Sequence, residues 1–328
     1  AQGCAPAHCS SRMPQRRSPA PCASEDSATP RPYRRLAMER ARFLLGTAGV
    51  ALAHRVPARA PLRSRLAARV AAEAAASSGT LGLCVRRLVP GPPLVAYNAT
   101  LSFPTASVIK VLILVTLMRR VERKPSLWHR EIALREKELV AGSDVLADAQ
   151  PGQHFTVEQL ARAMIEQSDN SAANAIIDLV GFHAVAETAR LAGMRDTQLE
   201  RYFMDIRAIA NHSDNRSTPR DLAQLLYLIA VGAHESVRTI AEPLTCRTMV
   251  EIMLQQKYRD KIPAGMPPGI PIANKTGEID GVRNDIAIVD PFGNDPYVIA
   301  ALTMHDADIS AADEAIRRVA RAVYDVLG

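Results

Sequence analysis

Long apolar runs are missing from this chain of 328 residues. The two longest strongly apolar stretches, residues 43–53 and 111–118, are far shorter than the ~20 residues that a helix needs to cross a bilayer. The sequence therefore excludes an enzyme embedded in a membrane. The 48% of apolar residues is instead typical of a globular core, and at about 150 residues per domain the length admits one large domain or two small ones.

Cysteines and metal-ligand patterns are scarce as well. Three of the five cysteines lie before residue 38, which leaves only Cys84 and Cys246 in the rest of the chain. Two cysteines so far apart give neither a disulfide framework nor the spacing of a metal site. The eight histidines include no pair at the helical spacing of metal ligands. We therefore expect no metal and no cofactor, and we expect both cysteines to be small buried hydrophobes.

Several nucleotide and hydrolase signatures are also missing. The sequence has no phosphate-binding glycine loop, no internal repeat and no Gly-x-Ser-x-Gly elbow.

The net charge of +6 resides mainly in residues 1–37. Six arginines and two acidic residues give that segment a charge of +4, which leaves +2 for residues 38–328. Nothing in the charge distribution indicates a nucleic-acid partner.

The N-terminal part divides into two segments. Residues 1–37 hold six of the 22 prolines and few large apolar residues, so they cannot offset their ordering entropy, and we expect a disordered extension rather than a functional basic tail. Residues 38–53 combine a short basic stretch, an 11-residue apolar stretch and small residues before position 54. This pattern predicts a signal peptide and an exported protein, periplasmic or secreted. The alternative, an apolar helix of the folded domain, is disfavoured by two glycines and the abrupt change after Ala53.

Residues 54–328 are expected to form one catalytic domain of α+β class. Hydrophobic periodicity predicts helices over residues 62–77 and 310–327, an almost wholly helical stretch over 107–256, and strand-like runs over 81–85, 94–97, 270–275, 285–289 and 297–303. Strands at both ends of the chain, around a helical insert, predict one antiparallel sheet flanked by helices. The expected division is a sheet-bearing part of about 60–105 and 268–328 and an all-α part of about 106–267.

A serine and a lysine stand at the start of the most apolar helix. Ser107 is followed by Lys110 three residues later, which places both on one helical face. A lysine can take a proton from a serine hydroxyl only when it is neutral, which requires burial or a nearby cation. A lone Ser-x-x-Lys is more often a helix cap with a surface lysine. Here the lysine precedes Val111, Leu112 and Ile113, so we expect it to be buried.

Two further motifs follow in order. Ser168-Asp169-Asn170 offers a second hydroxyl and a carboxamide, and Lys275-Thr276-Gly277 at the end of a strand-like run offers a cation, a hydroxyl and a position without a side chain. Each motif is weak alone. The ordered set is the signature of class A β-lactamases and penicillin-binding proteins.

With these motifs in place, residues from about 60 to 328 resemble the serine β-lactamase and DD-peptidase superfamily, and they are most similar to the class A β-lactamase-like serine hydrolases. Residues 168–174 and 217–219 also resemble class A sequence. The resemblance implies a sheet-bearing part with a five-stranded antiparallel sheet, an all-α part, and an active site between them.

The resemblance also implies roles for the motif residues. Ser107 is the acylated nucleophile, Lys110 its general base, and Ser168 the relay that passes a proton to the leaving nitrogen. The charge of Lys275 near Lys110 lowers the pKa of that base.

Substrate binding is implied at the same motifs. Asn170 holds a side-chain amide of the substrate, Lys275 and Thr276 bind its carboxylate, and Gly277 leaves room beside the strand. The oxyanion lies between the backbone N–H groups of Ser107 and Glu278, each of which is worth about 3 kcal/mol in comparable sites. The Glu278 side chain stands where class A enzymes usually have a small residue, so it narrows the binding edge or changes its charge.

One departure concerns deacylation. Class A enzymes activate the deacylating water with a glutamate on a loop between the second and third motifs, and in this sequence Phe203 falls at that position. Asn174, which would steady the glutamate, is retained. Glu200 and Asp205 are candidate substitutes, although each is more simply explained as a loop or capping carboxylate.

These observations predict an exported class A β-lactamase-like serine hydrolase that forms an acyl-enzyme through Ser107, deacylates slowly and contributes to β-lactam catabolism or resistance. The expected partner is a small β-lactam or peptidoglycan-like molecule, and the chain is expected to be a monomer. The alternatives are a DD-peptidase or an esterase of the same superfamily, or a penicillin-binding sensor without turnover.

Overall fold

The computed structural model describes residues 61–77 and 79–327, and all of them belong to one compact unit. The predicted extension 1–37 and the predicted signal peptide 38–53 lie outside the described residues. In the part of the chain that is described, no helix is both long and apolar enough to cross a membrane.

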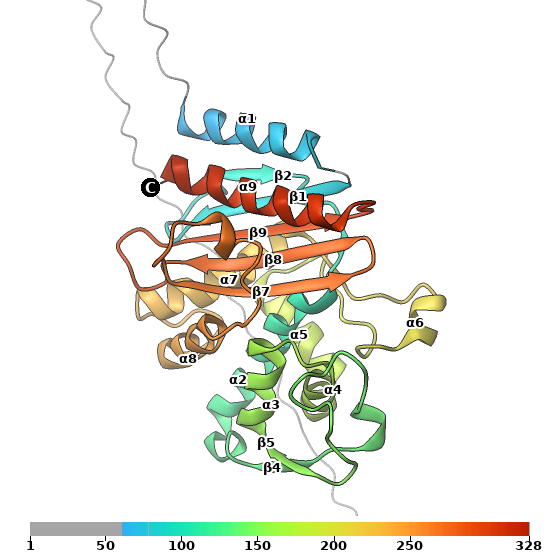
Figure 1. The fold of residues 1–328 in the computed structure, drawn as a ribbon. Helices are drawn as coiled ribbons and strands as arrows, with labels where there is room; N and C mark the ends of the chain where they lie inside the picture. The colour runs from blue at the N-terminus through green and yellow to red at the C-terminus, as the bar shows by residue number, and fades with distance from the viewer. Residues whose placement is uncertain (1–60, 78, 328) are drawn as a thin grey trace, which may run out of the picture. The chain divides into compact units, whose positions relative to one another are not determined.

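The centre of this unit is a five-stranded antiparallel sheet (Figure 1). Its strands, in spatial order, are β2 (Val95–Tyr97), β1 (Thr80–Arg87), β9 (Tyr297–Met304), β8 (Val282–Val289) and β7 (Ile272–Ile279). Strands from the two ends of the chain pair directly, since β1 lies beside β9 over its whole length. The prediction of one antiparallel sheet built from both chain ends is confirmed.

Both faces of the sheet are covered by helices. Helices α1 (Leu62–Ala75) and α9 (Ile309–Leu327) lie on one face, whereas α7 (Pro219–His234) and α8 (Pro243–Leu254) lie on the other (Figure 1). Side chains that alternate along β9 therefore enter two different cores, and all but one of its residues are buried. The predicted helices over 62–77 and 310–327 are confirmed with slightly different ends.

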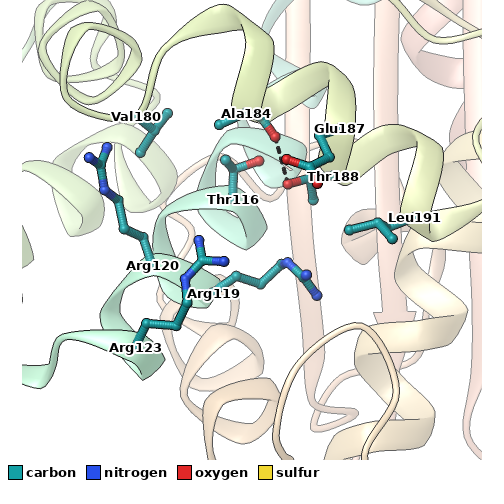
Figure 2. Close-up of a pocket in the computed structure, with 9 residues that line it drawn as sticks. All are labelled: Thr116, Arg119, Arg120, Arg123, Val180, Ala184, Glu187, Thr188 and Leu191. Carbon is teal, nitrogen blue, oxygen red and sulfur yellow. Dashed lines mark hydrogen bonds between the residues drawn. The ribbon is translucent and has the colours of Figure 1, made fainter. Parts of the chain in front are cut away.

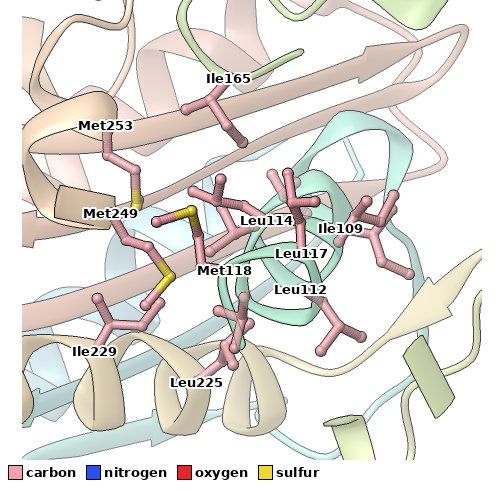
Figure 3. Packing of buried hydrophobic residues seen from close by; sticks show 14 of the residues in the cluster. Ile109, Leu112, Leu114, Leu117, Met118, Ile165, Leu225, Ile229, Met249 and Met253 are labelled. Carbon is pink, nitrogen blue, oxygen red and sulfur yellow. The ribbon is translucent and has the colours of Figure 1, made fainter. Parts of the chain in front are cut away.

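Most of the remaining helices pack against α2 (Lys110–Arg123), which begins directly after the 3₁₀ helix Ala106–Ile109. Every side chain of α2 from Lys110 to Met118 is buried. Figure 3 shows residues of α2 packed beside residues of α7 and α8, including Leu225, Met249 and Met253. Burial of each such side chain stabilises the fold by about 1.5–3 kcal/mol, so the segment that carries Ser107 is rigidly held.

Other helices complete this part of the chain. They are α3 (Val157–Glu166), α4 (Asn170–Val180), α5 (Phe182–Ala192) and α6 (Ile206–Ala210), with short 3₁₀ helices at Pro125–Leu127, Glu136–Glu138 and Pro263–Gly265.

The helical stretch expected over 107–256 is interrupted, and this corrects the prediction. Strands β4 (Glu131–Ala133) and β5 (His154–Thr156) form one small ribbon, and β3 (Phe103–Pro104) pairs with β6 (Arg216–Ser217) in another. Residues 139–153 and 193–205 form loops without a long helix. Strands of two or three residues are too short to show a period in the sequence. The segment predicted to be all-α therefore includes short β ribbons.

Candidate active site

Ser107 lies in the 3₁₀ helix Ala106–Ile109, immediately before α2. The preceding residue, Ala106, has φ of 45°, a left-handed conformation that costs about 1–3 kcal/mol for a residue with a Cβ. Neighbouring hydrogen bonds hold this turn: Thr105 donates to Asn215 O from both its backbone N and its hydroxyl, and Asn284 Nδ2 donates to Thr105 O at 3.1 Å. Ser107, the expected nucleophile, thus follows a strained turn that neighbouring hydrogen bonds hold in place.

Gly277 brings strand β7 close to this turn. A Cβ added at Gly277 would lie 2.8 Å from Thr105 O, 2.9 Å from Ser107 N and 3.0 Å from Val108 N. All three are backbone atoms, so they cannot move aside as a flexible side chain would. The third motif was predicted to end its strand, but β7 continues to Ile279, and the glycine sits within the strand beside Ser107.

Lys110 is buried, as its position before an apolar run predicted, and its side chain is 0% exposed. Its Nζ donates to Ser168 O at 2.5 Å, to Asn170 Oδ1 at 2.7 Å and to Ser168 Oγ at 3.4 Å. Burial, reinforced by the positive charge of Lys275, lowers the pKa of Lys110 well below its ordinary value, against the opposing effect of Asp169. Burial thus favours the neutral form of Lys110, the form that a general base needs.

Ser168 lies between the two lysines of the site. Its Oγ accepts hydrogen bonds from Lys275 Nζ at 2.9 Å and from Lys110 Nζ at 3.4 Å. Lys275 also donates to Thr276 O at 2.8 Å. Burial lowers the pKa of Lys275 to about 7, even though Asp285 and Glu278 act in the opposite direction. The lysines of the first and third motifs therefore meet at the hydroxyl of the second.

Asp169 holds the second motif in place, a role that no sequence pattern indicates. Its buried carboxylate accepts hydrogen bonds from Ala172 N at 2.8 Å, Leu146 N at 2.9 Å and Val145 N at 3.1 Å. It therefore caps α4 and fastens the loop 139–153 beside Ser168. Asn170 also binds this loop, since its Nδ2 donates to Ala141 O at 3.0 Å.

A cavity of about 250 Å³ opens directly beside Ser107. Its lining unites the predicted residues with residues that no motif marked: Ser107, Gly142, Asp144, Gln167, Ser168, Asn170, Tyr258, Thr276, Gly277 and Glu278. Asp144 and Tyr258 lie in loops that carry no recognisable pattern, and only the fold places them at the cavity.

The carboxylate of Glu278 is paired rather than free. Lys261, which is 0% exposed, donates to Glu278 Oε1 and also lies 3.2 Å from Asp260 and 3.7 Å from Asp313. Glu278 therefore remains at the edge of the cavity with its charge balanced by a buried cation. No sequence pattern identified Lys261, because its acidic neighbours come from three separate segments.

Phe203 lies next to Asn174, the residue that was expected to steady a glutamate in its place. Its backbone N–H donates to Asn174 Oδ1 at 2.9 Å, and its carbonyl accepts from Asn174 Nδ2 at 3.2 Å. The phenyl ring is 7% exposed, and its centroid lies 4.4 Å from Lys110 Nζ. The ring therefore places an apolar surface against Lys110.

The two candidate substitute carboxylates are engaged elsewhere. Glu200 is exposed, and its Oε2 accepts from Ser213 Oγ at 3.2 Å. Asp205 caps the short helix α6 through Ala208 N at 3.0 Å. Asp205 lines a separate cavity of about 220 Å³, shared with Phe203 and Asn174, and neither carboxylate is among the residues that line the Ser107 cavity.

A further cavity of about 250 Å³ lies between α2 and α5 (Figure 2). Three arginines of α2 line it, but the side chains of Arg119 and Arg120 extend in opposite directions and donate to the backbone carbonyls of Ile240 and Leu179. These arginines tie helix ends together and do not converge on one point.

Comparison with known proteins agrees with this geometry. The sequence model of the beta-lactamase enzyme family matches residues 63–327. A beta-lactamase from Sphaerobacter thermophilus is 30% identical, covers 81% of this chain and 97% of its own, and superposes with a TM-score of 0.71. A beta lactamase from Xanthomonas campestris is 26% identical over 81% of this chain and 99% of its own, with a TM-score of 0.72.

A related structure carries an acyl group. It is a leucine-to-glutamate mutant of PBP-A, solved as an acyl-enzyme complex with penicillin G, and it is 28% identical over 80% of this chain and 95% of its own, with a TM-score of 0.70. Because the family model spans most of the described residues and the class A enzymes share the α+β fold, the chain belongs to the beta-lactamase enzyme family and is a serine hydrolase of the β-lactamase type.

Proposed function

We propose that this enzyme opens the amide of β-lactams through an acyl-enzyme on Ser107 and that it hydrolyses this acyl-enzyme slowly. The observation that carries the proposal is the position of Phe203. Asn174 holds the backbone of Phe203, and the phenyl ring lies over Lys110, where a deacylating base is otherwise expected.

Acylation follows from the three motifs. Neutral Lys110 accepts the proton of Ser107 Oγ, and the oxygen attacks the β-lactam carbonyl carbon. The C–N bond of the ring then breaks, and the proton reaches the departing nitrogen through Ser168 Oγ, which both lysines contact. The developing oxyanion lies near the backbone N–H groups of Ser107 and Glu278, at the point where Gly277 allows the strand to approach.

Binding of an anionic β-lactam rests on the third motif. Thr276 lines the cavity and Lys275 lies directly behind it. The positive charge of Lys275 attracts the substrate carboxylate. The paired state of Glu278 matters here, because Lys261 offsets a negative charge that would otherwise repel an anion at the same edge.

No comparable catalytic group is evident for deacylation among the described residues. General-base assistance is typically worth ~10² to 10⁴ in rate, and the carboxylates nearest in sequence, Glu200 and Asp205, are occupied by Ser213 and Ala208. The Phe203 ring also takes space that an attacking water would need. The acyl-enzyme is therefore expected to accumulate.

Pre-steady-state hydrolysis of a chromogenic cephalosporin tests the proposal. We expect a burst of about one ring opening per enzyme molecule followed by slow turnover, and no burst in Ser107→Ala. A burst that persists in Ser107→Ala would contradict the nucleophile. Linear rapid turnover from the first seconds would contradict slow deacylation, and a burst with no further turnover would identify a penicillin-binding sensor instead.

Export and a contribution to β-lactam resistance complete the proposal. Support for export comes from the residue pattern of 38–53 in the sequence. A role in resistance would follow because even slow turnover, or acylation alone, removes β-lactam from the space outside the cell membrane.

A further inference from the structure

Two loops meet at the wall of the Ser107 cavity. Tyr258 belongs to the segment between α8 and β7, and Asp144 belongs to the loop 139–153. Tyr258 Oη donates a hydrogen bond to Asp144 Oδ2 at 2.6 Å, and both residues line the cavity. This pair, which we call the latch, joins residues that are 114 positions apart in the sequence.

We propose that the latch determines how large an acyl side chain the enzyme accepts, so that compact side chains are preferred while it is closed. The inference rests on the proposed function, since it concerns the substrates that acylate Ser107.

The tyrosine side of the latch is firmly anchored. The backbone N–H of Tyr258 donates to Gln256 Oε1 at 3.0 Å, and its carbonyl accepts from Asn274 Nδ2 at 3.1 Å. Gln256 and Asn274 are both almost fully buried, so the backbone that carries the ring cannot move freely. The hydrogen bond to Asp144, together with burial, raises the pKa of Tyr258 to about 12, and the phenol remains a donor at neutral pH.

The aspartate side is anchored in the same way. The two residues after Asp144 donate their N–H groups to the buried carboxylate of Asp169. The residue before it, Ser143, is buried and hydrogen-bonded to Ser171 Oγ at 2.7 Å. Both halves of the latch are therefore tied to elements of the active site, and the hydrogen bond between them connects two rigid walls.

The latch affects substrate size because the cavity is small. A volume of about 250 Å³ is below the ~300–1,000 Å³ of sites that enclose drug-sized ligands. A bulky acyl side chain therefore needs room beyond this volume, and where it passes between Asp144 and Tyr258, which both line the cavity, their hydrogen bond must break. One net hydrogen bond corresponds to about a 2- to 10-fold change in rate, and a compact substrate does not incur this cost.

Acylation rate constants for two matched penicillins test the proposal. The pair is 6-acetamidopenicillanic acid and nafcillin, which share one nucleus and one charge and differ in the size of the acyl group. We expect Tyr258→Phe and Asp144→Ala each to raise the nafcillin-to-acetamido ratio by about 2- to 10-fold. The double variant should show no further increase, because both substitutions break the same bond. Tyr324→Phe is the control. Tyr324 lines a different cavity, which shares no residue with the Ser107 cavity, so this substitution should leave the ratio unchanged.

The outcomes separate the latch from a structural role and from the proposed function. Equal losses for both penicillins, an unchanged ratio or fully additive effects would overturn the latch. The same variants are assayed with p-nitrophenyl acetate and p-nitrophenyl 1-naphthoate, which any acyl-transferring serine can hydrolyse. If no penicillin acylates Ser107 while the ester ratio shifts as expected, the proposed function is wrong and the latch stands. If the ester ratio also stays constant, the latch is wrong as well.

Discussion

Replacement of Phe203 by glutamate asks directly whether the missing carboxylate limits deacylation. Asn174 binds the backbone of Phe203 and not its ring, so the substitution keeps the main contact of this loop. The ring centroid lies 4.4 Å from Lys110 Nζ, and a carboxylate in its place would lie within reach of both Lys110 and a water beside the Ser107 ester.

The expected magnitude has two parts. A carboxylate that acts as general base should shorten the lifetime of the acyl-enzyme by ~10² to 10⁴. It should also raise the pKa of Lys110 relative to the parent enzyme, because an opposite charge favours the protonated lysine, so acylation should need a higher pH. The loss of the side chain of Phe203, a residue that is 7% exposed, should lower the free energy of unfolding by about 3–5 kcal/mol.

The assay follows the decay of the penicillin adduct by intact-protein mass spectrometry after excess penicillin is removed. Phe203→Gln is the matched control, because glutamine has the shape of glutamate and loses the same ring contacts but cannot accept a proton as a carboxylate does. Equal adduct lifetimes in the two variants would refute the reasoning. A short lifetime in the glutamate variant alone would support it.

Three further predictions follow from the same geometry. Burial lowers the pKa of Lys275 to about 7, so this lysine loses its charge as the pH rises through that value. Acylation by an anionic penicillin should therefore decline between about pH 6 and 8, whereas hydrolysis of a neutral p-nitrophenyl ester should not. Lys275→Ala should remove the decline and weaken penicillin acylation more than ester hydrolysis, and equal losses would mean that Lys275 acts on the base. Gly277→Ala should slow acylation by ~10-fold or more, because the added Cβ would lie 2.9 Å from Ser107 N and displace the reacting groups. The circular dichroism spectrum should not change, and unaltered acylation would contradict the close approach of the strand to Ser107. Asp169→Ala should lower the free energy of unfolding by about 3 kcal/mol or more, because three N–H groups lose a buried acceptor. Urea titration measures this change, and substitution of the exposed Asp280 by alanine should change the free energy little.

The predictable part of the fold is the part with a regular period. Helix α9 and strands β8 and β9 were expected close to their observed bounds, because long amphipathic and apolar runs show their period in the sequence. The 3₁₀ helix Ala106–Ile109 and the ribbons β3–β6 and β4–β5 were not expected. Their two to four residues are held by partners far along the chain rather than by local preference.

The site was predictable to the extent that its residues form motifs. Ser107, Lys110, Ser168 and Lys275 were named from spacing and resemblance, and the burial of Lys110 followed from the apolar residues after it. The pairing of Lys261 with Glu278 could not be predicted from the sequence, because the acidic residues around Lys261 come from separate segments.

The same limit applies to the wall of the cavity. Nothing in the sequence connects Asp144 with Tyr258, since only the folded chain brings these two loops together. The role of Asp169 was also hidden, because its partners Val145 and Leu146 donate backbone N–H groups, which carry no sequence signal.

Intact-protein mass spectrometry during reaction with benzylpenicillin tests the central claim most directly. Ring opening leaves the whole penicillin attached to Ser107, so the enzyme should gain one full penicillin mass, keep it long after free penicillin is removed, and gain nothing in Ser107→Ala. Rapid steady-state turnover with no detectable adduct would contradict the account, and it would point to Glu200 or Asp205 as the working base.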